Sequence, residues 1–217
     1  MDNGESRTRA PLLGEVLPVE LMNTTWADRA GVHDALATPA ETLAWIRAIQ
    51  HRLTPQPEAL TGWLHDYRRA GAAQAFQQLR VLRDALRCLA ASATGDIRVA
   101  AASAGPDRQA AIETLDRACA TAPTWLTLHW PDGEEPHCRL HSNATPGQTV
   151  VSMLAEQAVE LFSGDLRSQL RACQAPGCVL YFVKQHPRRE WCSASCGNRA
   201  RVARHYHRRR NDVRASP

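Results

Sequence analysis

The sequence lacks an apolar run long enough to cross a membrane. Its longest apolar stretch, Val150 to Phe162, is interrupted by Glu156 and Glu160, and a spanning helix needs about 20 apolar residues. The acidic start, with no apolar segment after it, argues against a secretory signal peptide. With 44% hydrophobic and 22% charged residues, the composition excludes a disordered, collagen-like or membrane protein.

Common active-site motifs are also absent. The chain contains no Gly-x-Ser-x-Gly, no phosphate-binding loop, no dinucleotide fingerprint and no His-Glu-x-x-His. His129, His137, Cys138 and His141 lie close together in the sequence and offer a second metal site as an alternative. However, residues 137, 138 and 141 do not share one face of a strand. We therefore expect a protein that is not an enzyme.

Lysine is nearly absent, since Lys184 is the single lysine among 26 basic residues. The charged residues are unevenly distributed along the chain. Residues 1–166 carry 14 basic and 20 acidic side chains, a net charge of −6. Residues 167–217 carry 12 basic and 2 acidic side chains, a net charge of +10. An acidic body joined to a basic end indicates a polyanionic partner.

Seven cysteines, an odd number, argue against a disulfide framework and for a reducing cytoplasm. Four of them, Cys173, Cys178, Cys192 and Cys196, form a C-x4-C-x13-C-x3-C pattern. Two close pairs separated by a short span are typical of a tetrahedral zinc site. Four thiolates leave no open coordination position, so one structural Zn²⁺ is expected. The alternative is four ordinary buried cysteines.

Residues 16–166 predict a mainly helical domain with a small antiparallel hairpin, an α+β fold. Thr38 and Glu41, with Pro39 between them, form a capping box at the start of one helix. Further helices are expected over residues 59–70, 72–93, 107–120 and 146–162, and a hairpin is expected over 124–141. Residues 19–26 fit either a strand or the opening of a helix, and residues 1–15 fit a flexible terminus.

Residues 167–211 predict a small zinc-stapled domain, followed by a tail over residues 212–217. Pro176-Gly177 supplies a knuckle turn between the first two cysteines. Residues 179–183 and 188–191 are expected to pair as a β-hairpin, and a helix over about 193–210 carries the last two cysteines. Knuckle, hairpin and helix in this order make a treble-clef-like zinc finger.

The run from Cys196 to Arg199 reads Cys-Gly-Asn-Arg and resembles the CGNR zinc finger. Glu190 stands where that family usually has an arginine. Upstream, Glu20 to Thr24 and the stretch 34–39 resemble the ABATE domain that precedes this finger, with Leu-Met in place of the usual Phe-Val. The resemblance implies a bacterial transcription regulator. Within the motif, Gly197 is expected to allow a close approach, and Asn198 and Arg199 to brace the knuckle.

Arg201, Arg204, His205 and Arg208 share one face of the last expected helix, at positions i, i+3, i+4 and i+7. Val202 and Tyr206 lie on the other side and are expected to pack on the finger. An arginine-rich face suits a phosphate backbone or a major groove. The expected nucleic-acid contacts are Arg188, Arg189, Arg201, Arg204, His205, Arg208, Arg209 and Arg210.

Duplex DNA is the expected partner, which places the protein in the bacterial cytoplasm and at the nucleoid when bound. The alternatives are a solvated basic face, a face docked on the acidic body, or a zinc-stapled RNA-binding or protein-interaction module. The helical domain is expected to sense a small ligand or to mediate dimers. Asn23, Thr24 and Arg29 are the candidate ligand pocket, and a helix cap is the alternative for them.

Overall fold

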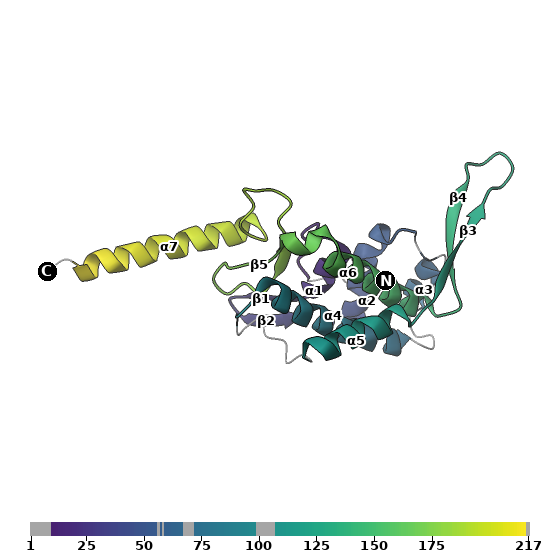
Figure 1. Cartoon of the computed structure of the whole chain (residues 1–217), viewed down its shortest axis with the longest axis horizontal. Helices are drawn as coiled ribbons and strands as arrows, with labels where there is room; N and C mark the ends of the chain where they lie inside the picture. Colours follow the sequence, from purple (N-terminus) through teal and green to yellow (C-terminus); the bar gives the residue numbers. More distant parts are fainter. Residues whose placement is uncertain (1–9, 56, 58, 67–71, 99–106, 216–217) are drawn as a thin grey trace, which may run out of the picture.

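The computed structural model describes residues 10–55, 57, 59–66, 72–98 and 107–215, with the backbone alone at residue 207 and residues 209–215. Its centre is the long helix α4 (Ala72–Thr94). Helices α5 (Arg108–Cys119) and α6 (Pro146–Ser163) pack along α4, and the short α1 (Leu17–Met22) lies against both α4 and α6 (Figure 1). The apolar stripe predicted for α4, which includes Phe76, Leu79 and Leu86, is buried in this core. The expected helical domain is confirmed.

Two helices begin at capping boxes. In α2 (Pro39–Ile49) the Thr38 hydroxyl accepts from the backbone N–H of Glu41, and the Glu41 carboxylate accepts from the N–H of Thr38, as predicted. Thr145 and Gln148 form the same arrangement at the start of α6. Each box satisfies donors that a helix start leaves unpaired.

The remaining N-terminal elements are short. Residues 19–26 divide between α1 and strand β1 (Thr25–Asp28), which pairs antiparallel with β2 (Gly31–Asp34). A 3-10 turn, η1 (Gln50–Arg52), follows α2. Helix α3 (Leu60–His65) covers the first half of the helix expected over 59–70, whose residues 67–70 lie outside the described part.

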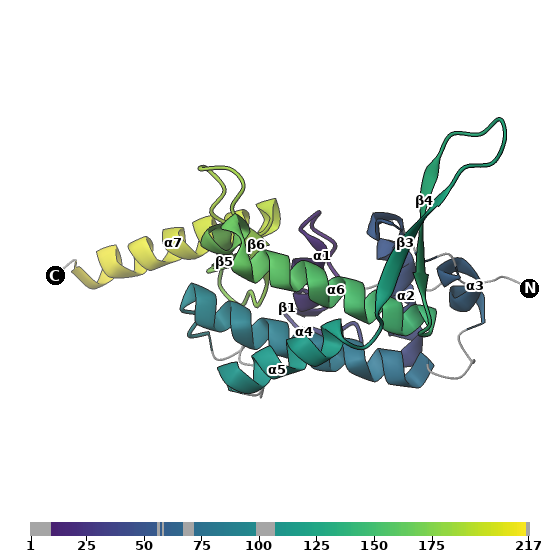
Figure 2. The ribbon, with the colours of Figure 1, turned by 45° about the vertical axis from the view of Figure 1, so that its right-hand side comes forward.

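Strands β3 (Thr124–His129) and β4 (His137–Ser142) form the predicted hairpin, with Leu126 opposite Leu140 and Leu128 opposite Cys138. Figures 1 and 2 show this hairpin projecting away from the helices. Among the helices of the described residues, none is both long and apolar enough to span a bilayer.

The zinc-finger region contains the 3-10 helix η3 (Asp165–Gln169), strands β5 (Leu170–Ala172) and β6 (Tyr181–Val183), and helix α7 (Ala194–Ala215). The hairpin predicted between residues 179–183 and 188–191 is wrong. Strand β6 instead pairs antiparallel with β5, which precedes the first cysteine. Residues 188–191 form a loop, because Arg189 donates side-chain hydrogen bonds to the carbonyls of Val183 and Cys192.

Strand β6 and the residue before it are shared by two apolar clusters. Tyr181 and Val183 belong to the main core of the helical domain, whereas Leu180 and Phe182 pack with the cysteines of the finger. Alternate residues of a strand point to opposite faces. The finger is therefore joined to the body through a buried strand rather than through a flexible linker.

Two further expectations are corrected at the ends of the chain. Residues 10–15 are not a loose terminus, since Glu15 is 2% exposed and accepts a hydrogen bond from the N–H of Val183; residues 1–9 lie outside the described part. Val202 and Tyr206 do not pack on the finger, since they are 55% and 66% exposed. Beyond its first turns α7 extends away from the body, so nothing in the described chain covers that side (Figures 1 and 2).

Candidate metal centre and basic helix

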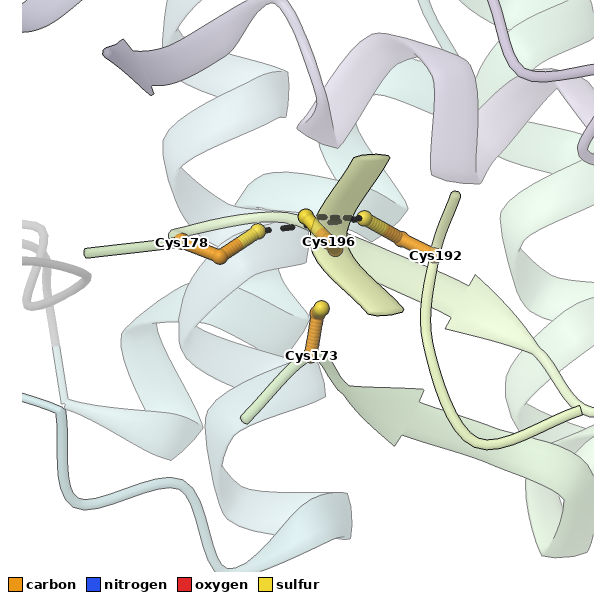
Figure 3. Close-up of side chains that lie close together, drawn as sticks. All are labelled: Cys173, Cys178, Cys192 and Cys196. Carbon is orange, nitrogen blue, oxygen red and sulfur yellow. Dashed lines mark hydrogen bonds between the residues drawn. The ribbon is translucent and has the colours of Figure 1, made fainter. Parts of the chain in front are cut away.

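The sulfur atoms of Cys173, Cys178, Cys192 and Cys196 all lie within 4.8 Å of one another, and all four residues are buried. The Cys178 and Cys192 sulfurs are 3.8 Å apart, and those of Cys192 and Cys196 are 3.4 Å apart. Tetrahedral zinc with Zn–S bonds of about 2.3 Å requires sulfurs about 3.8 Å apart. Figure 3 shows the four side chains converging on one point. The predicted four-cysteine zinc site is confirmed.

The local backbone positions the two pairs of cysteines, Cys173 with Cys178 and Cys192 with Cys196. Cys173 directly follows β5, and its N–H donates to the carbonyl of Leu180 at 3.0 Å. The turn before Cys178 contains Gly177 with a φ of +71°, a conformation that side chains disfavour. The second pair stands at the start of α7, where Cys192 precedes the helix and Cys196 lies in its first turn.

The thiols of Cys173, Cys178 and Cys192 lie close enough together to shift one another's pKa in opposite directions. Hydrogen bonding with Cys178 holds the pKa of Cys173 below its ordinary value. Hydrogen bonding to Cys173 raises the pKa of both Cys178 and Cys192. A divalent cation removes this conflict, because zinc binds thiolates and releases their protons.

Arg98 holds the backbone of the zinc knuckle from the helical domain. Its Nη1 donates to the carbonyl oxygens of Cys173 at 2.8 Å and Cys178 at 2.9 Å. Asp96, whose side chain is 1% exposed, fixes the guanidinium with bonds of 2.8 Å to Nε and 2.6 Å to Nη2. Burial raises the pKa of the Asp96 carboxyl group, but these hydrogen bonds have the larger combined effect, and the pKa is lowered overall. No local pattern in the sequence indicates this pair, because Arg98 lies 75 residues before Cys173.

Arg189 holds the second half of the finger. Its guanidinium donates to Glu15, to the carbonyl of Cys192 at 3.0 Å and to that of Val183 at 3.1 Å. The group also lies 5.0 Å from the ring centroid of Phe182. Arg189 was expected to contact phosphate, but in the structure its hydrogen bonds are made inside the protein.

The Cys-Gly-Asn-Arg run begins with the last zinc ligand, Cys196. Arg199 donates from Nη2 to the sulfur of Cys196 at 3.0 Å, a contact that partly neutralises the four thiolates. A Cβ on Gly197 would lie 3.1 Å from Cδ1 of Trp191, so the indole packs where a side chain would interfere. Asn198 is exposed and accepts a hydrogen bond from Arg201.

The first turns of α7 present the expected basic face. Arg201, Arg204, His205 and Arg208 are exposed, and so is Arg188 in the preceding loop. A shallow cavity of about 560 Å³ lies between this loop and the helix start, lined by Arg188, Trp191, Arg201 and Arg204 among others. Side chains of Arg209 and Arg210 lie outside the described part of the structure.

Asn23, Thr24 and Arg29 do not meet around a cavity. The Asn23 amide is fully buried and bonded to the backbone of Tyr181. The Thr24 hydroxyl donates to the carbonyl of Leu21 at 2.7 Å, at the end of α1, and a strand rather than a helix follows, so the cap at a helix start is not found either. Arg29 is exposed in the turn between β1 and β2. A cavity of about 460 Å³ lies elsewhere, between α4, α5 and α6.

The histidines of the β3–β4 hairpin do not form a second metal cluster within the described residues. His129 and His137 face each other with ring centroids 4.9 Å apart, whereas His141 stacks on Trp125. Across the parts of the chain that the structure describes, the four cysteines are the one group of three or more side chains placed to hold a metal.

The fold and the site define a helical domain joined to a four-cysteine zinc finger. Two family models match the chain in that order. Residues 15–165 match the ABATE family, described as "Putative stress-induced transcription regulator", and residues 169–209 match the CGNR zinc finger. The chain belongs to the ABATE family and carries a CGNR zinc finger after that domain. A comparison with curated proteins found no match.

Proposed function

We propose that this protein is a transcription regulator that binds duplex DNA through the start of α7. The observation that carries the proposal is the exposed cationic face of Arg201, Arg204, His205 and Arg208 on a helix anchored at the zinc centre. The family description supports the regulatory role.

Charge and rigidity both favour a phosphate partner. The region from residue 167 carries a net charge of +10, and four thiolates with one zinc reduce this to about +8. Cys192 and Cys196 fix the helix start, and Arg189 and Glu15 fix the loop before it. The helix that carries these arginines is therefore held in place before it meets a phosphate backbone, which lowers the ordering cost of binding.

Salt-dependent binding tests the proposal. Zinc-loaded protein should bind random duplex DNA with a log–log salt slope of about −0.9 for each phosphate neutralised. Replacing Arg201, Arg204 and Arg208 by Ala should weaken binding and make the slope shallower by up to about 0.9 for each arginine. The matched control replaces Arg29, Arg108 and Arg117, three exposed arginines of the helical domain, by Ala. Equal effects of the two triple variants would contradict the proposal.

Two further experiments define the target. Selection from a random oligonucleotide pool with zinc-loaded protein should recover a sequence motif. Competition among duplex DNA, RNA and heparin at one salt concentration separates DNA binding from the RNA-binding or protein-interaction alternative. A flat selection together with equal competition by heparin favours that alternative.

We infer that the chain acts by binding rather than by catalysis. Four thiolates occupy every position of a tetrahedral zinc, which leaves none for a substrate. Two roles were expected for the helical domain. A thermal-shift screen with metabolite pools tests ligand sensing, and a shift of the unfolding midpoint is the expected sign of it. Dimer formation is supported by the exposed side chains of the β3–β4 hairpin and of α7.

A further inference from the structure

Two appendages carry six of the eleven large hydrophobic side chains that are exposed among the described residues. They are the hairpin arm, defined as residues 124–142, and α7. The six side chains are Trp125, Leu126, Leu128, Trp130, Val202 and Tyr206. Exposed apolar clusters of this kind mark interaction sites.

The hairpin arm has one distinctly apolar face. Leu126 and Leu128 are 61% and 72% exposed and, two residues apart, lie on the same side of β3. Trp130 follows at 67% exposed. An isolated two-stranded sheet is marginally stable in water, so an arm of this composition gains from a covering partner.

The two appendages carry opposite charges. Asp132, Glu134 and Glu135 are exposed at the tip of the arm. Arg204 and Arg208 are exposed on α7, on the side of the helix opposite Val202 and Tyr206. In the part of the chain that the structure describes, none of these five charged side chains forms an ion pair. The acidic tip of the arm and the arginine face of α7 are therefore complementary in charge.

Within one chain these surfaces stay apart. Figures 1 and 2 both show the hairpin arm and α7 at opposite ends of the elongated molecule. A second copy laid antiparallel beside the first brings each arm to the partner's α7. The arm of each copy then contacts α7 of the other, and these two equivalent contacts close the assembly with two-fold symmetry.

We propose that the protein forms this antiparallel dimer, in which the hairpin arm of each copy docks on α7 of the other. The acidic tip of each arm pairs with Arg204 and Arg208 on α7 of the other copy. The dimer does not depend on nucleic-acid binding. If the proposed function also holds, the arm covers guanidinium groups that contact phosphate, so that dimer and DNA compete.

Sedimentation velocity of the zinc-loaded full chain, without nucleic acid, tests the dimer. The wild-type protein should be dimeric at low salt and dissociate toward monomer at about 1 M salt, where the Debye length is about 3 Å. The variants E134K/E135K and R204E/R208E should each raise the dimer dissociation constant at least about tenfold. Mixed in equal amounts they should dimerise again, because the arm and helix of each then meet the opposite charge on the other.

The matched control is E113K/E160K, which makes the same change in charge at exposed carboxylates outside the arm and should remain dimeric. Zinc content and circular dichroism should be equal in all variants. A monomeric wild-type protein at low salt overturns the proposal. So does a dimer that survives R204E/R208E, which would indicate contact between two arms, and so does a mixture that stays monomeric. None of these outcomes bears on DNA binding by the monomer.

Discussion

The side-chain amide of Asn23 pairs with the backbone of Tyr181 as a neighbouring strand would. Its Nδ2 donates to the Tyr181 carbonyl at 2.9 Å, and its Oδ1 accepts from the Tyr181 N–H at 2.9 Å. Asn23 follows α1, and Tyr181 begins the strand that carries the finger. Both residues are fully buried. One side chain therefore satisfies both backbone groups of a residue 158 positions away and ties the two parts of the protein together.

Asn23→Ala should lower the free energy of unfolding by about 2–4 kcal/mol, because it leaves a buried donor and a buried acceptor unpaired. Urea denaturation followed by circular dichroism measures this. The control is Asn143→Ala at an exposed position, which should change stability by less than about 0.5 kcal/mol. Similar values for the two variants would contradict the role assigned to Asn23.

Arg98→Lys should weaken zinc binding about 10–100-fold, a typical effect of losing a group that orients metal ligands. A lysine ammonium keeps the charge but lacks the planar fork that binds Asp96 with two nitrogens while reaching the Cys173 and Cys178 carbonyls. Competition with a chromophoric chelator gives the affinity. Arg108→Lys, at an exposed position in α5, is the control and should bind zinc like the wild type.

Removing zinc should destabilise the helical domain as well as the finger. Tyr181 and Val183 lie in the main core, and their strand is placed by β5 and the zinc knuckle. Chelation or Cys173→Ser should therefore lower the urea midpoint of the helical signal, whereas Cys138→Ser, at an exposed cysteine, should retain one zinc per chain. A helical midpoint that is the same with and without zinc would show that the two parts unfold independently.

The features that the sequence predicted are those set by neighbouring residues. The zinc ligands follow from the spacing of Cys173 to Cys196, and the start of α2 follows from Thr38 and Glu41, three residues apart. The period of the apolar residues gives α4, and its change near Thr124 gives the β3–β4 hairpin. In each case the interacting groups lie close together in the sequence, so that their spacing indicates the local structure they form.

The features that the sequence did not predict depend on contacts between distant segments. Strand β6 pairs with β5 rather than with residues 188–191, because Glu15 and Arg189 occupy the positions around Val183. Asn23 looked like part of a polar pocket, since nothing near it in the sequence indicates Tyr181 as its partner. Arg189 looked like a phosphate contact, because an arginine in a basic loop has the same local pattern whether it points outward or inward.

Asp96 makes the stability of the contact between the helical domain and the zinc finger, here called the joint, depend on pH. Its carboxylate binds Arg98 and accepts a hydrogen bond of 2.8 Å from the Tyr181 hydroxyl. Burial raises the pKa of Tyr181 to about 12, and the bond to Asp96 adds to this, so the phenol stays a donor over the whole acidic and neutral range. The pKa of Asp96 is lowered in the folded protein, from an ordinary value of 3.8.

A lowered pKa means that the folded protein binds the Asp96 proton more weakly than the unfolded chain. The stabilisation is therefore fully present above the unfolded pKa and is lost as the pH falls through the folded one. Asp96→Asn should cost about 1–3 kcal/mol at pH 7. The difference between variant and wild type should shrink as the pH falls below about 4. Zinc release in acid lowers the stability of both proteins, so the difference between their urea unfolding free energies isolates Asp96. A difference that stays constant down to about pH 3 would mean that the Asp96 charge contributes nothing to the joint.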